Sequence, residues 1–240
     1  MEDSKKESKA KNFIKRYCNN KLAVIGFFTL VLITLIVIIA PPFLPFSEAE
    51  IDPLAFNMPP SAKHLLGGDD VGRDVLSRLL YGGRVSLAVG IFSTAVSVIV
   101  GIPLGMLAAF YRGAFEVVVM RLSDIFMSFP STILILFLVS MFGPSIITVT
   151  VVIGVLGWPK FARQIYGSVL SIREKDYIEG AVAIGAKDKL IITRYILPNA
   201  VAPIFISITF RIASAIILES SLSFLGMGVQ PPAASWGNML

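Results

Sequence analysis

Few residues in this 240-residue chain could do covalent or metal chemistry. Cys18 is the only cysteine and His64 the only histidine, so neither a disulfide nor a thiolate metal cluster can form within the chain. The sequence has no Gly-x-x-x-x-Gly-Lys-Ser/Thr phosphate loop for ATP. One imidazole, one thiol and no clustered carboxylates within an apolar span leave nothing to assemble a nucleophile or a metal centre. The sequence therefore argues against an enzyme and against a metal site.

Two charges are conspicuous because they interrupt an apolar stretch, residues 200–225. Arg211 lies near its middle, where a lone charge costs roughly 2.5–3.5 kcal/mol on insertion scales. We expect Arg211 to face a substrate carboxylate in a pathway, or else a carboxylate of a neighbouring protein. Glu219 lies two turns later, about 12 Å along the helix axis, which is too far for a close ion pair within one helix. We expect Glu219 to bond to nearby backbone or to a partner, with a pathway role as the alternative.

The remaining polar candidates have plainer interpretations. Arg121 and Asp124 lie three residues apart and predict a local ion pair on one helical face. His64 is a single imidazole, so a nickel-ligand role is disfavoured. Cys18 is expected to be an ordinary reduced thiol, with palmitoylation as the alternative.

Apolar runs predict the fold class. Of all residues, 55% are hydrophobic and 15% charged, and the mean hydropathy of +0.78 exceeds what a water-soluble core can hide. A helix needs about 20 apolar residues to cross the roughly 30 Å hydrocarbon layer. The stretches that fit are residues 22–40, 85–110, 125–142, 145–158 and 200–225. The sequence therefore predicts an all-α integral membrane protein with five spans.

The basic residues predict the orientation, because Lys and Arg near span ends resist translocation. Seven lie before Leu22 and seven between residues 158 and 198, whereas the residues after 225 carry none. The tail 1–21 and the loop 159–198 are therefore expected in the cytoplasm. The net charge of +5 then reflects membrane topology and needs no nucleic-acid partner. The first span runs directly into Pro41 without a small-x-small cleavage site, which disfavours a signal peptide.

The segment 41–84 has balanced charges and is expected outside, mostly as an extended loop. Residues 69–84 have apolar side chains at helical spacing, which predicts a short amphipathic helix on the membrane surface or packed on a neighbour. In the second span, Gly101 and Gly105 lie four residues apart and predict close approach of another helix. Pro130 in the third span is given the same packing role.

The loop 159–198 predicts two short helices joined by a glycine turn. Residues 163–184 have helical apolar spacing, and the break from Gly185 to Asp188 places Asp188 at the N-cap of a second helix. That second helix, residues 189–196, is expected to stop at Pro198. Such a helical hairpin either docks in a groove of a partner or is a packed connection. The pattern alone favours neither interpretation.

The order of residues in this loop resembles a known signature. Glu179-Gly-Ala-x-x-x-Gly185, followed by Leu197-Pro198, is similar to the loop of binding-protein-dependent ABC importer permeases. Together with residues 64–78, 127–131, 222–232 and 235–237, it resembles the second membrane subunit of dipeptide, oligopeptide and nickel importers. The resemblance runs from about Lys21 to the last residue. It departs at Gly180, where the family usually has Ala, and at Tyr195.

The resemblance implies a division of labour. This chain would form half of a pathway for peptides, and a second, similar permease would form the other half. Two ATPase subunits would bind ATP and magnesium, and an external binding protein would deliver substrate, so no cofactor is expected on this chain. Nickel or another small solute is the alternative substrate. The location implied is a bacterial or archaeal inner membrane, crossed several times.

The family's six spans have both termini in the cytoplasm. Residues 85–240 would accordingly be the permease domain, ending before the sixth span and following the first span over 22–40. The docking loop implied by the resemblance would sit in a groove of one ATPase subunit through Glu179, Gly180, Ala181, Gly185, Leu197 and Pro198. Glu179 would pair with a basic residue of the ATPase or fix the loop internally. Closure of the ATPase pair would then rock the spans between inward-open and outward-open states.

Three other classes compete with a permease of this kind. A channel or a secondary transporter should complete its own pathway. A simple membrane anchor would need neither Arg211 nor the docking loop. Co-purification with an ATPase separates the importer from all three.

Overall fold

The chain is mostly helical in the computed structural model, which describes residues 19–240. The β pairing in this range consists of two isolated bridges, Ile51 with Arg73 and Gly68 with Asp74. The chain divides into two compact units, Met1–Tyr81 and Gly82–Leu240. Apart from its last three residues, the basic tail predicted over 1–21 lies outside the described residues, and so does Cys18.

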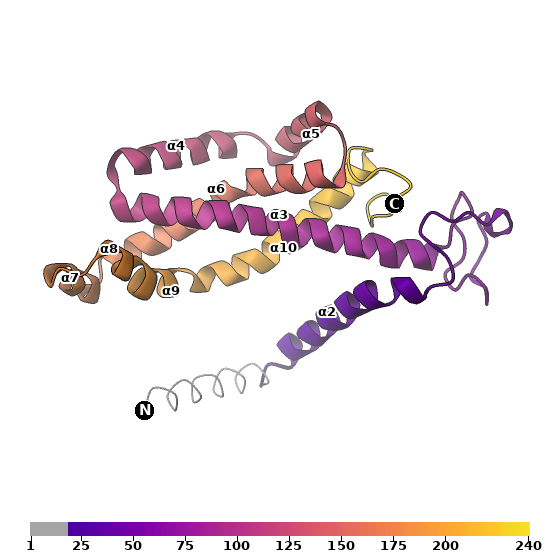
Figure 1. Ribbon diagram of the computed structural model, residues 1–240, viewed down its shortest axis with the longest axis horizontal. Helices are drawn as coiled ribbons and strands as arrows, with labels where there is room; N and C mark the ends of the chain where they lie inside the picture. The colour runs from indigo at the N-terminus through magenta and orange to yellow at the C-terminus, as the bar shows by residue number, and fades with distance from the viewer. Residues whose placement is uncertain (1–18) are drawn as a thin grey trace. The chain divides into compact units, whose positions relative to one another are not determined.

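Four helices are long and apolar enough to cross a membrane: α2 (Lys21–Ile39), α3 (Val75–Tyr111), α6 (Ile146–Arg173) and α10 (Ala202–Phe224) (Figure 1). A fifth crossing exists if α4 (Gly113–Ser128) and α5 (Ser131–Phe142), bent by 89°, count as one span. The predicted all-α membrane fold is thereby confirmed.

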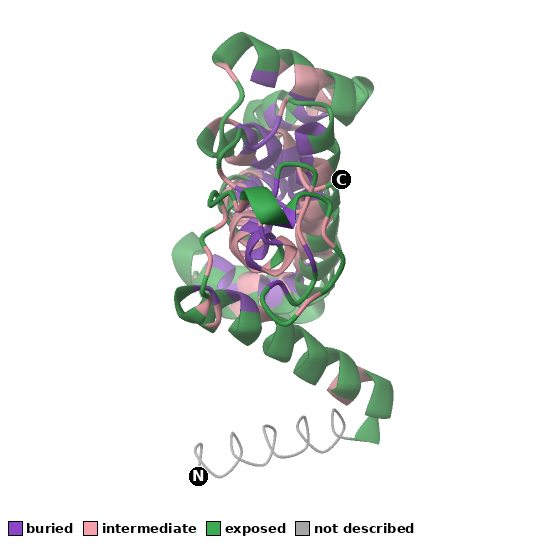
Figure 2. Cartoon of the chain, turned by 90° about the vertical axis from the view of Figure 1, so that its right-hand side faces the viewer, coloured by how far each residue is buried: buried purple, intermediate pink, exposed green. Residues whose placement is uncertain are grey.

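The helix α2 exposes an apolar surface along most of its length. Asn20 begins it as N-cap, with its side-chain oxygen accepting the backbone N–H of Ala23 at 3.3 Å. Within α2 only Val37 is buried, and Figure 2 draws the helix next to the grey trace almost wholly as exposed. Such an apolar surface requires an apolar environment. Two short 3₁₀ turns, η1 (Pro41–Phe43) and η2 (Pro53–Ala55), follow in the same unit.

The surface helix predicted over residues 69–84 is not a separate element. Residues 69–74 form turns and bridges, and α3 begins at Val75 and continues without a break to Tyr111. Asp74 caps it, because its Oδ2 accepts the backbone N–H of Ser77 at 2.7 Å. The apolar spacing that suggested a surface helix belongs to the first turns of the span itself.

The predicted close approach at Gly101 and Gly105 is confirmed, and the partner helix is α6. A Cβ at Gly101 would lie 2.6 Å from the carbonyl oxygen of Trp158, and one at Gly105 would lie 2.1 Å from that of Ala162. Both distances are shorter than any real contact, so only glycine allows α3 and α6 to pack this closely.

The third span was predicted as one helix over residues 125–142, and this is wrong. It breaks between α4 and α5, where Phe129 has an extended backbone (φ −96°, ψ 142°). Pro130 is the cause, because a proline disfavours helical geometry in the residue before it and offers no N–H. The fourth span also differs, since α6 continues through Pro159 to Arg173.

The predicted loop 159–198 contains four short helical segments after α6. They are α7 (Asp176–Ala183), α8 (Asp188–Leu190), the π-helical η3 (Ile191–Ile196) and α9 (Leu197–Ala200). Asp188 is not an N-cap, since that position belongs to Lys187 and no side chain caps it. Pro198 does not stop the helical run. It lies in the first turn of α9, where a missing N–H is tolerated.

Candidate docking loop and polar groups of the spans

The helix α7 has one face in the core and the other open. Ile178 and Ala181 are buried, whereas Glu179 and Gly180 are exposed. Ile178 belongs to one hydrophobic cluster with residues of α3, α6, η3, α9 and α10. The helix α7 is therefore seated in the core through Ile178 and Ala181 and leaves Glu179 accessible. Gly180 is open, because a Cβ there would meet nothing within 4 Å among the described residues.

Gly185 ends α7 in the manner expected from the sequence. Its φ of +77° is left-handed, a conformation that glycine adopts without strain. Its N–H bonds to the carbonyl of Val182 at 2.9 Å, and the N–H of Ala186 bonds to that of Ala181 at 3.0 Å. This pair of bonds is the Schellman motif. The glycine turn is thus a helix stop that orients α8 against α7.

Leu197 and Pro198 lie apart from the exposed face of α7, in α9. Leu197 is half-buried and Pro198 exposed, and Asn199 donates from its side chain to the carbonyl of Tyr195 at 2.6 Å. The structure therefore places the six residues of the predicted docking loop on two segments of one hairpin.

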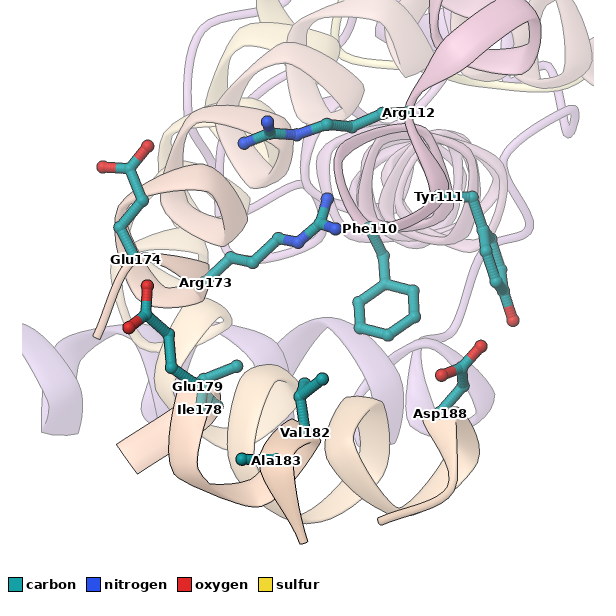
Figure 3. A pocket seen from close by; sticks show the side chains of 10 residues that line it. All are labelled: Phe110, Tyr111, Arg112, Arg173, Glu174, Ile178, Glu179, Val182, Ala183 and Asp188. Atoms are coloured by element: carbon teal, nitrogen blue, oxygen red, sulfur yellow. The ribbon is translucent and has the colours of Figure 1, made fainter. Parts of the chain in front are cut away.

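A hollow of about 700 Å³ opens beside α7 (Figure 3). Its positive charges come from Arg112, at the end of α3, and Arg173, at the end of α6. Its carboxylates are those of Glu174, Glu179 and Asp188. Arg173 donates to the carbonyl of Ala109 at 3.3 Å and lies 5.7 Å from the ring centre of Phe110. These contacts tie the end of α6 to the end of α3.

Arg211 projects from α10 toward α6. Its Nη2 donates to the carbonyl of Ile153 at 2.8 Å, while its Nε is buried and has no hydrogen-bond partner among the described residues. Gly157 makes room for it, because a Cβ there would lie 2.5 Å from Nη2. The carboxylate expected from a substrate or a neighbouring protein would come from outside this chain and stays a prediction. Within residues 19–240 the guanidinium donates to a backbone carbonyl.

Glu219 is enclosed by its own chain, with no exposed surface. Ser86 of α3 donates to its Oε2 at 2.8 Å, and Ser223 donates to its Oε1 at 2.6 Å. The backbone N–H of Trp236 donates in turn to Ser86 at 3.2 Å, and that of Val229 to Ser223 at 3.1 Å. Glu219 therefore joins α3, α10 and the segment after α10. The expected backbone or partner contact is replaced by two hydroxyl groups of the same chain.

Asp124 has a stronger partner than the predicted one. Arg121 Nη1 lies 3.8 Å from Asp124 Oδ2, and Arg163 of α6 makes a much closer ion pair with Asp124 Oδ1. Tyr166, also on α6, donates a short hydrogen bond to Glu116 of α4. Polar pairs thus link α4 to α6.

His64 is a structural residue of the first unit. It is buried, stacks on Phe46 with ring centres 4.5 Å apart, and places Nδ1 3.0 Å from Asp74 and Nε2 3.4 Å from Asp52. Lys63 donates to Asp52 at 2.5 Å and lowers the pKa of that carboxyl from 3.8 to about 2. Across residues 19–240, no three His, Cys, Asp or Glu side chains lie close enough to hold a metal ion.

Comparison with known families gives two matches that together cover most of the chain. Residues 101–240 match the family described as "Binding-protein-dependent transport system inner membrane component". Residues 8–60 match the "N-terminal TM domain of oligopeptide transport permease C". The second match ends within the segment that precedes α3.

Curated relatives align over nearly the whole chain. The dipeptide transport system permease protein DppC of Alkalihalophilus pseudofirmus is 38% identical over 226 residues, which is 94% of this chain and 74% of that protein. The glutathione transport system permease protein GsiD of Pectobacterium atrosepticum is 40% identical over 96% of this chain and 77% of its own length. The oligopeptide transport system permease protein OppC of Bacillus subtilis is 33% identical, over 95% and 75%.

A solved structure has the same fold. It is the inward-facing MetNI methionine ABC transporter, with a TM-score of 0.56 and 22% identity. The similarity covers 67% of this chain and 77% of that one.

Proposed function

The chain belongs to the family of binding-protein-dependent transport system inner membrane components, and from this premise we propose that it is a permease subunit of an ATP-driven peptide importer. Relatives named for dipeptides, oligopeptides and glutathione support the peptide substrate. A second permease, two ATPase subunits and an external binding protein complete the proposed assembly in a bacterial or archaeal inner membrane. ATP and magnesium are assigned to the ATPase subunits.

The observation that carries the coupling proposal is the seating of α7. Its inner face, at Ile178, shares a core with Ile165 of α6 and Phe110 of α3. Its outer, exposed side includes Glu179, which also lines the hollow beside α7. A force applied to the outer face is therefore transmitted to two membrane-crossing helices, because close-packed cores move as units and deform little.

The mechanism we propose uses that rigidity. An ATPase subunit holds α7 in a groove, and closure of the ATPase pair on ATP displaces the hairpin. Since Arg173 binds the carbonyl of Ala109, the ends of α6 and α3 shift together. The spans then rock between inward-open and outward-open states. Arg211 lines the pathway in this proposal, whereas Glu219 lies inside the chain and is assigned no contact with substrate.

The experiment is purification of the full importer from membranes with wild-type chain or with Glu179→Arg. The measurements are ATPase co-purification, ATPase activity with and without binding protein, and peptide uptake. We expect the mutant to lose the ATPase subunits or to hydrolyse ATP without responding to binding protein. The control is Glu50→Arg, which reverses an exposed charge in the first unit.

Each result has a defined meaning. A Glu179→Arg assembly that stays intact and coupled removes Glu179 from the docking contact. Wild-type uptake of nickel or another small solute, with no uptake of peptides, replaces the peptide substrate and leaves the coupling proposal standing. If no ATPase co-purifies with the wild-type chain, the importer proposal is wrong and a channel becomes the better interpretation.

A further inference from the structure

A cavity of about 320 Å³ lies between α6 and α10, and we call it the Arg211 cavity. The described residues that line it are Lys160, Phe161, Gln164, Ser207, Phe210, Arg211 and Ser214. Those from α10 recur at intervals of three and four residues, and Lys160 and Gln164 are four apart on α6, so each set shares one helical face. The cavity therefore lies where one face of α6 meets one face of α10.

The charge of the lining has one sign. Lys160 and Arg211 are cations, and none of the described lining residues is acidic. Gln164, Ser207 and Ser214 add groups able to donate hydrogen bonds. Two cations beside one space give it a positive potential, which favours an anion. The chemistry of this lining therefore fits a small anion.

The guanidinium of Arg211 is held in place before any ligand arrives. Nη2 is fixed by the carbonyl of Ile153 at 2.8 Å, and the absence of a side chain at Gly157 lets the guanidinium lie this close to α6. Nε has no partner among the described residues although it is buried. A buried N–H without a partner is costly. Because Arg211 lines the cavity, a carboxylate that enters would meet a guanidinium already held in place.

We propose that the Arg211 cavity is a subsite for the C-terminal carboxylate of the transported peptide, an inference that rests on the proposed peptide import. Arg211 binds the carboxylate directly, and Lys160 contributes a second positive charge at the mouth. The subsite makes the permease itself discriminate between peptides with a free C-terminus and peptides with a neutral one. Specificity would then not reside in the binding protein alone.

The test uses the complete importer in proteoliposomes and two peptides that differ only in a C-terminal carboxylate or carboxamide. Each is supplied at a concentration that saturates the binding protein, so the binding protein's own preference drops out. The quantity measured is the ratio of free-acid to amide uptake. We expect the ratio to fall roughly fivefold in Lys160→Gln and at least about tenfold in Arg211→Gln.

Conservative variants separate recognition from structure. Lys160→Arg keeps the charge and is expected to keep the wild-type ratio. Arg211→Lys keeps the charge but loses the planar fork, so an intermediate ratio is expected. Lys160 is exposed, so Lys160→Gln tests the subsite even if Arg211→Gln fails to fold. Lys189→Gln removes an exposed lysine that does not line the cavity, and its ratio should stay at the wild-type value.

Three outcomes overturn the subsite. The first is a wild-type ratio of free-acid to amide uptake near one. The second is an unchanged ratio in Lys160→Gln and Arg211→Gln. The third is an equal loss of uptake of both peptides in these variants, which would make Arg211 a purely structural link between α10 and α6. In each of these the wild-type importer still takes up peptide, so the proposed function survives. Absence of uptake of either peptide by the wild type overturns the proposed function and the subsite together.

Discussion

The imidazole of His64 and the carboxylate of Asp74 lie 3.0 Å apart, from Nδ1 to Oδ1, and the second oxygen of Asp74 caps α3. The segment that precedes α3 is thereby joined to the first turn of a membrane-crossing helix. Replacing His64 by Ala removes this bond and the stack on Phe46. We expect a loss of about 2–4 kcal/mol in the free energy of unfolding, measured by thermal unfolding of the purified chain in detergent.

The matched control for His64→Ala is Lys63→Gln. Lys63 is the preceding residue and its side chain is 61% exposed, so its replacement should cost less than about 1 kcal/mol. Equal effects of the two substitutions would contradict a structural role that is specific to His64.

Two glycines of the docking hairpin should respond in opposite directions to alanine. At Gly180 a Cβ would meet nothing within 4 Å in the part of the chain that the structure describes, so Gly180→Ala should stabilise α7 by about 0.5–1 kcal/mol. At Gly185 the positive φ should make alanine cost about 1–2 kcal/mol. Hydrogen exchange of the α7 amides measures both changes, as slower exchange in the first variant and faster exchange in the second. The same sign in both variants would contradict the assigned turn geometry.

Loss of the Ser86 hydroxyl should loosen the segment after α10. Ser86→Ala removes the hydrogen bond to Glu219 and the one from the N–H of Trp236, at a cost of about 1–3 kcal/mol. Ser221→Ala is the control, because Ser221 is exposed and bonds only within its helix, to the carbonyl of Ile217. Limited proteolysis of residues 225–240 should accelerate in the first variant alone. Equal proteolysis rates would show that the network does not hold this segment.

Acidification should weaken the first unit through Asp52. Its pKa is lowered to about 2 from 3.8 by the hydrogen bond from Lys63, so the folded state favours the ionised form. The stability that ionised Asp52 contributes to the folded state is complete above pH 3.8 and is lost as the pH falls toward about 2. Lys63→Met should raise the pKa of Asp52 toward 3.8, as followed by the carboxyl carbon shift in labelled protein. An unchanged pKa would assign the shift to other donors.

Sequence reasoning succeeded where local pattern decides the structure. The apolar runs predicted the crossing helices, the spacing of Gly101 and Gly105 predicted a close helix pair, and Gly185 predicted the end of α7. In each case the physical cause acts over a few residues: hydrophobic length, the absence of a Cβ, or tolerance of positive φ.

The misses involve partners that are distant in the sequence. Ser86 and Glu219 are 133 residues apart, and no local feature connects them. The predicted pair of Arg121 and Asp124 is present, but the closer ion pair of Asp124 with Arg163 of α6 had no local signal. The bend at Pro130 did have a local signal, since proline restricts the residue before it. The apolar residues on both sides of Pro130 nevertheless led to the prediction of one continuous span.

The bend between α4 and α5 has a consequence for the surrounding lipid. In Figure 1, α4 runs alongside α6, so α5, turned by 89°, adds almost no depth to the crossing. The 16 residues of α4 reach about 24 Å at 1.5 Å per residue, which is some 6 Å less than the hydrocarbon thickness of roughly 30 Å. This hydrophobic mismatch is relieved when the bilayer thins locally or a neighbouring protein covers the ends. The chain should therefore favour thin membranes along this side when it is unaccompanied.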